Sequence, residues 1–134
     1  MTASIVYEGN LRCSVTHVQS GTVIETDAPI DNRGKGERFS PTDTVCVALG
    51  TCIITTMGIK ASDLGIDLSG AKLQVTKHML HEPRRIGAID VILDFPTTLN
   101  VSEDQQKLLQ KIGYNCPVVK SLNEGMKINV VYNW

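Results

Sequence analysis

Four cysteines and three histidines are the side chains of this sequence that we consider first as nucleophiles or metal ligands. The cysteines stand at positions 13, 46, 52 and 116, and the histidines at positions 17, 78 and 81. No Cys-x-x-Cys pair occurs, so the spacing supports neither a zinc site nor a thioredoxin-type redox motif. His78 and His81 lie three residues apart in a strand-like stretch, where their side chains would point to opposite faces. We therefore expect surface or turn histidines, no bound metal and no cofactor.

Cys52 and Cys116 are the two thiols whose expected positions bear on reactivity. Cys116 directly precedes Pro117 at the expected start of a short helix. Unpaired backbone N–H groups there favour a thiolate and would lower the pKa of the Cys116 thiol. Cys52 is expected in the middle of a long helix and needs a cation from elsewhere, such as Arg33 or Arg38 in the preceding loop. Local pattern alone leaves inert core thiols as the default role for both, with a reactive pair as the alternative.

Of the other two cysteines, Cys13 is assigned to packing, and the role of Cys46 stays open. Cys46 and Cys52 are six residues apart, about 600° of helical rotation, so they face different directions and are not expected to form a disulfide. Cys13 alternates with apolar residues in an expected strand, which is typical of a small sheet or core residue. Because the N-terminus shows no secretion signal, we expect all four thiols to be reduced.

A long apolar segment, residues 40–64, is predicted to form the helix around which the chain is organised. Ser40 fits the N-cap, Pro41 the first helical position, Asp43 a capping box with Ser40, and Gly65 the left-handed residue past the end. Apolar side chains occur on nearly every side, so we expect burial all round. The glycines at positions 50 and 58 weaken the helix and would let another backbone approach, such as that of a second subunit.

The remaining elements are predicted from alternating apolar residues, caps and turns. They are a strand pair over residues 5–18, strands over 21–26, 71–80, 86–95 and 126–132, and helices over 100–113 and 116–122. Residues 27–39 form a loop, which is either a solvated connection or a mobile segment that brings an arginine to the start of the long helix. This order predicts one α+β domain over residues 1–134 with a mainly antiparallel sheet.

Composition and charge argue against several classes of protein. A length of 134 residues suits one domain with its own core, and a net charge of -1 without a basic patch argues against nucleic acid or anionic membranes as partners. No apolar run is expected to reach transmembrane length, because glycines and threonines interrupt the best candidate between residues 50 and 58. The N-terminus lacks a signal-peptide pattern, so we expect a cytoplasmic protein.

Two separated motifs carry a resemblance to a known family. The pattern Ser-Pro…Leu-Gly-x-Cys covers residues 40–52, and Cys-Pro-Val follows at residues 116–118. Together they resemble the osmotically inducible protein C / organic hydroperoxide resistance family (OsmC/Ohr), and the order of elements agrees over nearly the whole chain. The resemblance implies an OsmC-like fold, an intertwined homodimer in which sheets from both subunits wrap around two long central helices.

The same resemblance implies a thiol peroxidase that reduces organic hydroperoxides in oxidative stress defence. Cys52 would be the peroxidatic cysteine, Cys116 would resolve it by forming a disulfide, and a dithiol reductant would reset the pair. The family activates the first thiol with an arginine from an N-terminal loop. We assign this role to Arg33, with Arg38 as the alternative.

At one position the sequence departs from the family pattern. The acid that positions the arginine belongs one residue after Pro41, where this chain has Thr42. A threonine cannot form a bidentate ionic pair with a guanidinium, and the neighbouring Asp43 is assigned to capping. Two alternatives therefore stay open: a non-catalytic binding protein that holds a small apolar ligand in the dimer groove, and a redox sensor.

Overall fold

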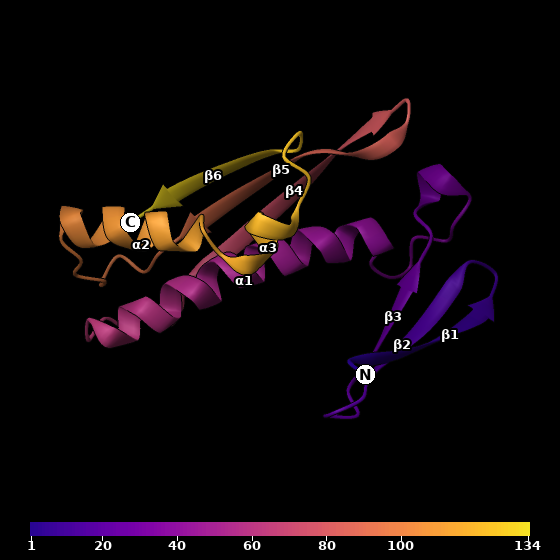
Figure 1. Cartoon of the computed structure of the whole chain (residues 1–134), viewed down its shortest axis with the longest axis horizontal. Helices are drawn as coiled ribbons and strands as arrows, with labels where there is room; N and C mark the ends of the chain where they lie inside the picture. The colour runs from indigo at the N-terminus through magenta and orange to yellow at the C-terminus, as the bar shows by residue number, and fades with distance from the viewer. The chain divides into compact units, whose positions relative to one another are not determined.

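The computed structural model describes residues 1–134, which form two compact units, 1–45 and 46–134 (Figure 1). The elements are β1 (Ala3–Gly9), β2 (Arg12–His17), β3 (Val23–Asp27), the 3-10 turn η1 (Ile30–Asn32), α1 (Pro41–Asp63), β4 (Lys72–His81), β5 (Arg84–Asp94), α2 (Glu103–Gly113), α3 (Pro117–Ser121) and β6 (Lys127–Asn133). The predicted α+β class is confirmed, with two sheets and a long helix. The prediction of a single domain over the whole chain stays a prediction.

The N-terminal unit is the expected antiparallel meander in the order β1-β2-β3. Its register places Ile5 opposite Val15 and Val15 opposite Ile24, so one face of the sheet carries an apolar row. Ile5 is 65% exposed and Ile24 is 53% exposed. The row therefore lacks the cover that an apolar sheet face normally has.

The C-terminal unit contains a sheet in the order β4-β5-β6. Strands β4 and β5 form the predicted antiparallel hairpin, whereas β6 runs parallel to β5. The parallel pairing follows from the connection, because α2 and α3 carry the chain back before β6 begins. The buried residues of β5 alternate as predicted: Ile89, Val91, Leu93 and, just past the strand, Phe95.

Helix α1 buries one face rather than its whole circumference. Leu49, Ile53, Met57 and Ala61 recur every four residues and are at most 1% exposed, and they share one core cluster with the buried side of β5. On the other side, Ile59 is 71% exposed. The prediction of burial all round is therefore wrong for a single chain, because the sheet covers only one face.

The length of α1 also corrects an expectation. The helix has 23 residues and a mean hydropathy of 1.6 in its best window, so by length and composition alone it could cross a membrane. The glycines and threonines between residues 50 and 58 do not interrupt the helix, because all of them are helical in the structure. The prediction that no apolar run reaches transmembrane length is therefore wrong. One face of α1 packs into the core cluster, and 33% of its most apolar window is buried within the chain.

The predicted cap of α1 is confirmed. The backbone N–H of Asp43 donates to Oγ of Ser40 at 3.1 Å, and the backbone N–H of Ser40 donates to Oδ2 of Asp43 at 2.7 Å. This reciprocal pair satisfies two amide groups at the start of the helix. Gly65 has a φ of 68°, the left-handed conformation expected just past the end of α1.

The absence of a side chain at Gly50 is explained by packing within the same chain. A Cβ added at this position would lie 2.9 Å from Cγ1 of Val75 on β4, which is too close for two carbon atoms. The glycine therefore admits a side chain of the same subunit, not the backbone of a partner as predicted. Gly58 has nothing within 4 Å of such a Cβ, so an approach by a second subunit there stays a prediction.

Candidate functional site

The fold brings together the two cysteines that the sequence singled out. Cys52 lies in the middle of α1 and is partly buried, and Cys116 is the fully buried N-cap of α3. Cys52 packs against the core cluster that contains Cys116, and it lies near enough to raise the pKa of the Cys116 thiol. No disulfide joins them in this structure.

Gly113, the last residue of α2, allows this approach. A Cβ there would lie 2.6 Å from Cγ of Met57 and 3.2 Å from Cγ2 of Ile53, both on α1. The chain then turns, and the backbone N–H of Cys116 donates to the Gly113 carbonyl at 3.1 Å. Close packing of this corner against α1 sets Cys116 beside Cys52.

The predicted lowering of the Cys116 pKa is wrong. Burial raises the pKa of the Cys116 thiol, and the neighbouring Cys52 raises it further. The backbone N–H groups of Val119 and Val118 act in the opposite direction but do not prevail. Helix α3 has only five residues, and the Cys116 side chain makes no capping hydrogen bond, so the effect of the helix start is weak.

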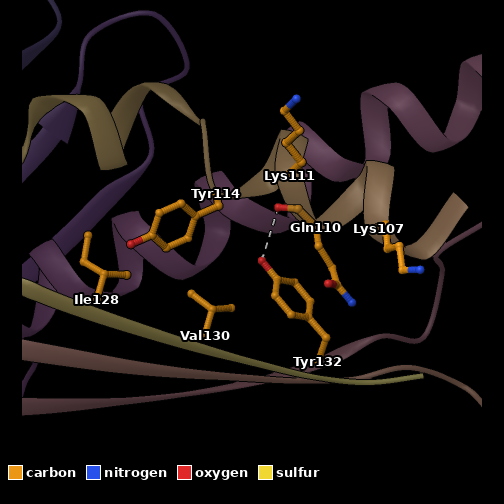
Figure 2. Close-up of a pocket in the computed structure, with 7 residues that line it drawn as sticks. All are labelled: Lys107, Gln110, Lys111, Tyr114, Ile128, Val130 and Tyr132. Atoms are coloured by element: carbon orange, nitrogen blue, oxygen red, sulfur yellow. Dashed lines mark hydrogen bonds between the residues drawn. The ribbon is translucent and has the colours of Figure 1, made fainter. Parts of the chain in front are cut away.

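Tyr132 is a neighbour of this pair that the sequence analysis did not single out. Its hydroxyl donates to the carbonyl oxygen of Gln110 at 3.5 Å, a long hydrogen bond drawn dashed in Figure 2. Burial, and then the charges of Cys116 and Tyr114, raises the pKa of Tyr132 to about 12. The alternation of Ile128, Val130 and Tyr132 on β6 was a signal that this ring faces the core side of the sheet.

The predicted cationic residues belong to the N-terminal unit. Arg33 is exposed and follows the turn η1 with a φ of 65°, and Arg38 pairs with Glu25 at 2.7 Å. Thr42 and Asp43 stand in the first turn of α1. The activation of Cys52 by Arg33 or Arg38 stays a prediction.

A charged network in the same unit was missed by the sequence analysis. The guanidinium of Arg12 donates to both carboxylate oxygens of Asp27, at 2.7 and 2.8 Å, and to Glu37 at 2.8 Å. The backbone N–H of Glu37 donates to Asp27 as well, at 3.1 Å. The two ends of the loop over residues 27–39 are also joined to each other, because the N–H of Asp27 donates to the Phe39 carbonyl.

No group of three or more His, Cys, Asp or Glu side chains is arranged to hold a metal ion. His78 hydrogen-bonds to Asp90 at 2.6 Å, and Asn129 donates to the other oxygen of that carboxylate. These two bonds lower the pKa of Asp90, with Asn129 making the larger contribution. The three side chains form a polar cluster on the exposed face of the sheet.

The structure is an α+β fold with two neighbouring thiols on α1 and at the start of α3, and comparison with known proteins identifies the family. A model of the family described as OsmC-like protein matches residues 34–131. The chain therefore belongs to the OsmC-like family. A comparison with curated proteins found no significant match.

Solved structures support the same family and fold. A provisionally named osmotic stress induced and detoxification response protein from Psychrobacter arcticus 273-4 is 39% identical with a TM-score of 0.94, covering 99% of this chain and 96% of that chain. An organic hydroperoxide resistance protein OsmC from Legionella pneumophila is 12% identical with a TM-score of 0.75 (98% and 95% covered). The organic hydroperoxide resistance protein OhrB of Bacillus subtilis is 14% identical with a TM-score of 0.68 (99% and 98% covered).

Proposed function

We propose that this chain is a thiol-dependent peroxidase that reduces organic hydroperoxides to alcohols in the cytoplasm. The observation that carries the proposal is that Cys52 and Cys116, 64 residues apart in the sequence, pack in one core as neighbours that interact electrostatically. Two inert core thiols have no need to be neighbours, whereas a disulfide-forming pair must be. Membership in the OsmC-like family and the names of two structural relatives agree with this activity.

The reaction proceeds in three balanced steps. The Cys52 thiolate attacks the terminal oxygen of the hydroperoxide, the O–O bond breaks, and the alkoxide leaves and takes a proton to become an alcohol. Cys52 is then a sulfenic acid. The Cys116 sulfur gives up its proton and attacks the Cys52 sulfur, so that a disulfide forms and water leaves. An external dithiol reduces this disulfide by exchange and is itself oxidised to a disulfide.

The environment of Cys116 suits the resolving role. Burial keeps its pKa raised, so it remains a thiol at neutral pH and is a poor competitor for the peroxide. Its proximity to Cys52 favours the second step, because a disulfide needs the two sulfur atoms side by side. Arg33, or Arg38 in its place, would supply the cation that favours the Cys52 thiolate.

We also propose that the protein works as a homodimer. The apolar row Ile5–Val15–Ile24 on the N-terminal sheet and the exposed side of α1 around Ile59 present apolar surface to solvent in the single chain. A second copy that covers both surfaces would remove the unfavourable exposure of apolar side chains to water. Light scattering coupled to size-exclusion chromatography should give about twice the 14.6 kDa chain mass, and a monomer at all concentrations would refute the dimer.

The peroxidase proposal is tested by consumption of cumene hydroperoxide with dithiothreitol as the dithiol. We expect turnover by the native protein and none by Cys52→Ser. When the dithiothreitol is removed before the peroxide is added, Cys116→Ser should react once and leave a sulfenic acid. Cys13→Ser is the matched control and should turn over normally, since Cys13 lies on β2 of the other unit. If the native protein consumes hydroperoxide no faster than Cys52→Ser, the proposal fails.

The role of the arginines is tested in the same assay. We expect Arg33→Met to slow hydroperoxide consumption at least about tenfold, the size of one lost catalytic electrostatic contact of about 1.4 kcal/mol. Arg38→Met is the comparison, because Arg38 already pairs with Glu25. The reverse order of effects would assign the role to Arg38.

A second candidate function is a non-catalytic binding protein. Thr42 favours it, because its hydroxyl lies 3.0 Å from Oγ of Ser40 and offers no carboxylate for a guanidinium. A mainly apolar cavity of about 190 Å³ lies between α1 and β4, lined by residues that include Ile54, Leu73 and Val75. Equal binding of a lipophilic ligand by native and Cys52→Ser protein, without peroxide turnover, would favour this function.

A further inference from the structure

A separate cleft lies between α2 and β6 in the C-terminal unit (Figure 2). Its volume is about 490 Å³, within the range of about 300–1,000 Å³ that is usual for small-molecule sites. The lining residues are Lys107, Gln110, Lys111, Tyr114, Ile128, Val130 and Tyr132. None of them takes part in the peroxidase chemistry proposed above.

The wall formed by β6 is apolar. Ile128 and Val130 are only partly buried; in Figure 2 Val130 lies between the rings of Tyr114 and Tyr132, and Ile128 lies on the other side of Tyr114. Tyr114 is 44% exposed, although it is an aromatic residue in a helix-end turn. Two aliphatic side chains and two aromatic rings line the same cleft and form a surface that suits the apolar body of a ligand.

The wall formed by α2 is cationic. Lys107 and Lys111 are four residues apart and therefore lie on the same side of the helix. Lys107 pairs with Glu103 at 3.0 Å, whereas Lys111 has no carboxylate within 4.0 Å. One positive charge at the rim of the cleft is thus uncompensated, beside hydroxyl and amide groups that can donate or accept hydrogen bonds.

We propose that this cleft binds a small organic anion that has an apolar body. The apolar body covers Ile128 and Val130, and the anionic group pairs with Lys111 at the rim. Binding of the anion in this cleft does not depend on peroxidase activity, and binding measurements alone test it.

The test uses octanoate as the probe and the full-length Cys52→Ser protein, which cannot turn over. Titration followed by ¹H–¹⁵N NMR should give saturable shifts at the amides of residues 107–114 and 128–132. Octylammonium, which has the same chain and the opposite charge, should bind at least about fivefold more weakly, as expected for one exposed charge pair.

Two variants locate the anion contact. Lys111→Gln should weaken octanoate binding about fivefold. Octanol, the uncharged analogue, should bind weakly and with the same affinity to Lys111→Gln and to the parent protein. Lys120→Gln is the matched control, since Lys120 is an exposed lysine on α3 outside the cleft, and it should bind like the parent protein. Shifts that map elsewhere, equal binding of octanoate and octylammonium, or no saturable binding would overturn the proposal.

Discussion

Replacing Gly50 by alanine tests how α1 packs against β4. The change adds one methyl group in the middle of a helix, where alanine is preferred over glycine by about 1 kcal/mol. On propensity alone the variant would be more stable. The structure predicts the opposite, because the new Cβ would lie 2.9 Å from Cγ1 of Val75.

The size of the effect follows from two opposing terms. Forcing an extra methyl group into a packed interior costs about 1–3 kcal/mol. Val75 is β-branched and sits on a strand, so it cannot rotate away easily. After the gain in helix propensity is subtracted, we expect Gly50→Ala to lower the free energy of unfolding by about 1 kcal/mol.

A double-mutant cycle with Val75→Ala isolates the contact. Removing Cγ1 leaves only Cδ2 of Leu73 near the new Cβ, at an ordinary contact distance of 3.9 Å. In the Val75→Ala background, Gly50→Ala should therefore stabilise the protein by about 1 kcal/mol, a coupling of about 2 kcal/mol between the two sites. Urea unfolding followed by circular dichroism at one protein concentration measures all four variants. A coupling below about 0.5 kcal/mol would refute this account of Gly50.

Three further predictions concern other parts of the chain. Gly58→Ala should raise the dimer dissociation constant measured by analytical ultracentrifugation if a partner backbone packs there, and a simple rise in stability of about 1 kcal/mol would argue against that contact. The pKa of Tyr132 is raised from 10.0 to about 12, so this residue stabilises the fold below pH 10, and that stability is lost as the pH rises towards 12. Because solvent screens a partly buried group, we expect the free energy of unfolding to fall by about 1 kcal/mol between pH 9 and 12 in urea unfolding, and Tyr132→Phe should abolish this fall. Identical pH dependence of the two proteins would contradict the prediction. The pKa of Asp27 is lowered, first by its hydrogen bonds from Arg12, so its contribution is present above its ordinary pKa and lost in acid; Asp27→Asn should lower the melting temperature at pH 7 and lessen its fall towards pH 3, whereas a parallel acid profile would show that the network contributes nothing.

The capped helix and the alternating strands were predictable because they depend on local signals. Ser40 and Asp43 carry the start of α1 in their own side chains, and the apolar alternation of β5 fixes its buried face. The spacing of apolar residues along the chain also predicted the order of helices and strands. It could not give the parallel partner of β6, because strand pairing depends on contacts far apart along the chain.

The candidate site was predictable in part. Resemblance named Cys52 and Cys116, but the lowered pKa expected for Cys116 failed, since burial is a property of the tertiary fold and outweighed the start of a five-residue helix. The partner of Arg12 was equally hidden, because Asp27 lies 15 residues away and meets it only through the pairing of β2 with β3. Gly50 was expected to admit another subunit, and only the register of β4 reveals that it admits Val75.

Mapping of the disulfide bonds after oxidation tests the central claim most directly. The reduced protein is treated with one equivalent of cumene hydroperoxide, alkylated, digested and analysed by mass spectrometry. We predict one dominant cross-link, between the peptide that contains Cys52 and the peptide that contains Cys116, and its loss after treatment with dithiothreitol. Four unmodified thiols after the peroxide treatment, or a cross-link that involves Cys13 or Cys46 instead, would contradict the account.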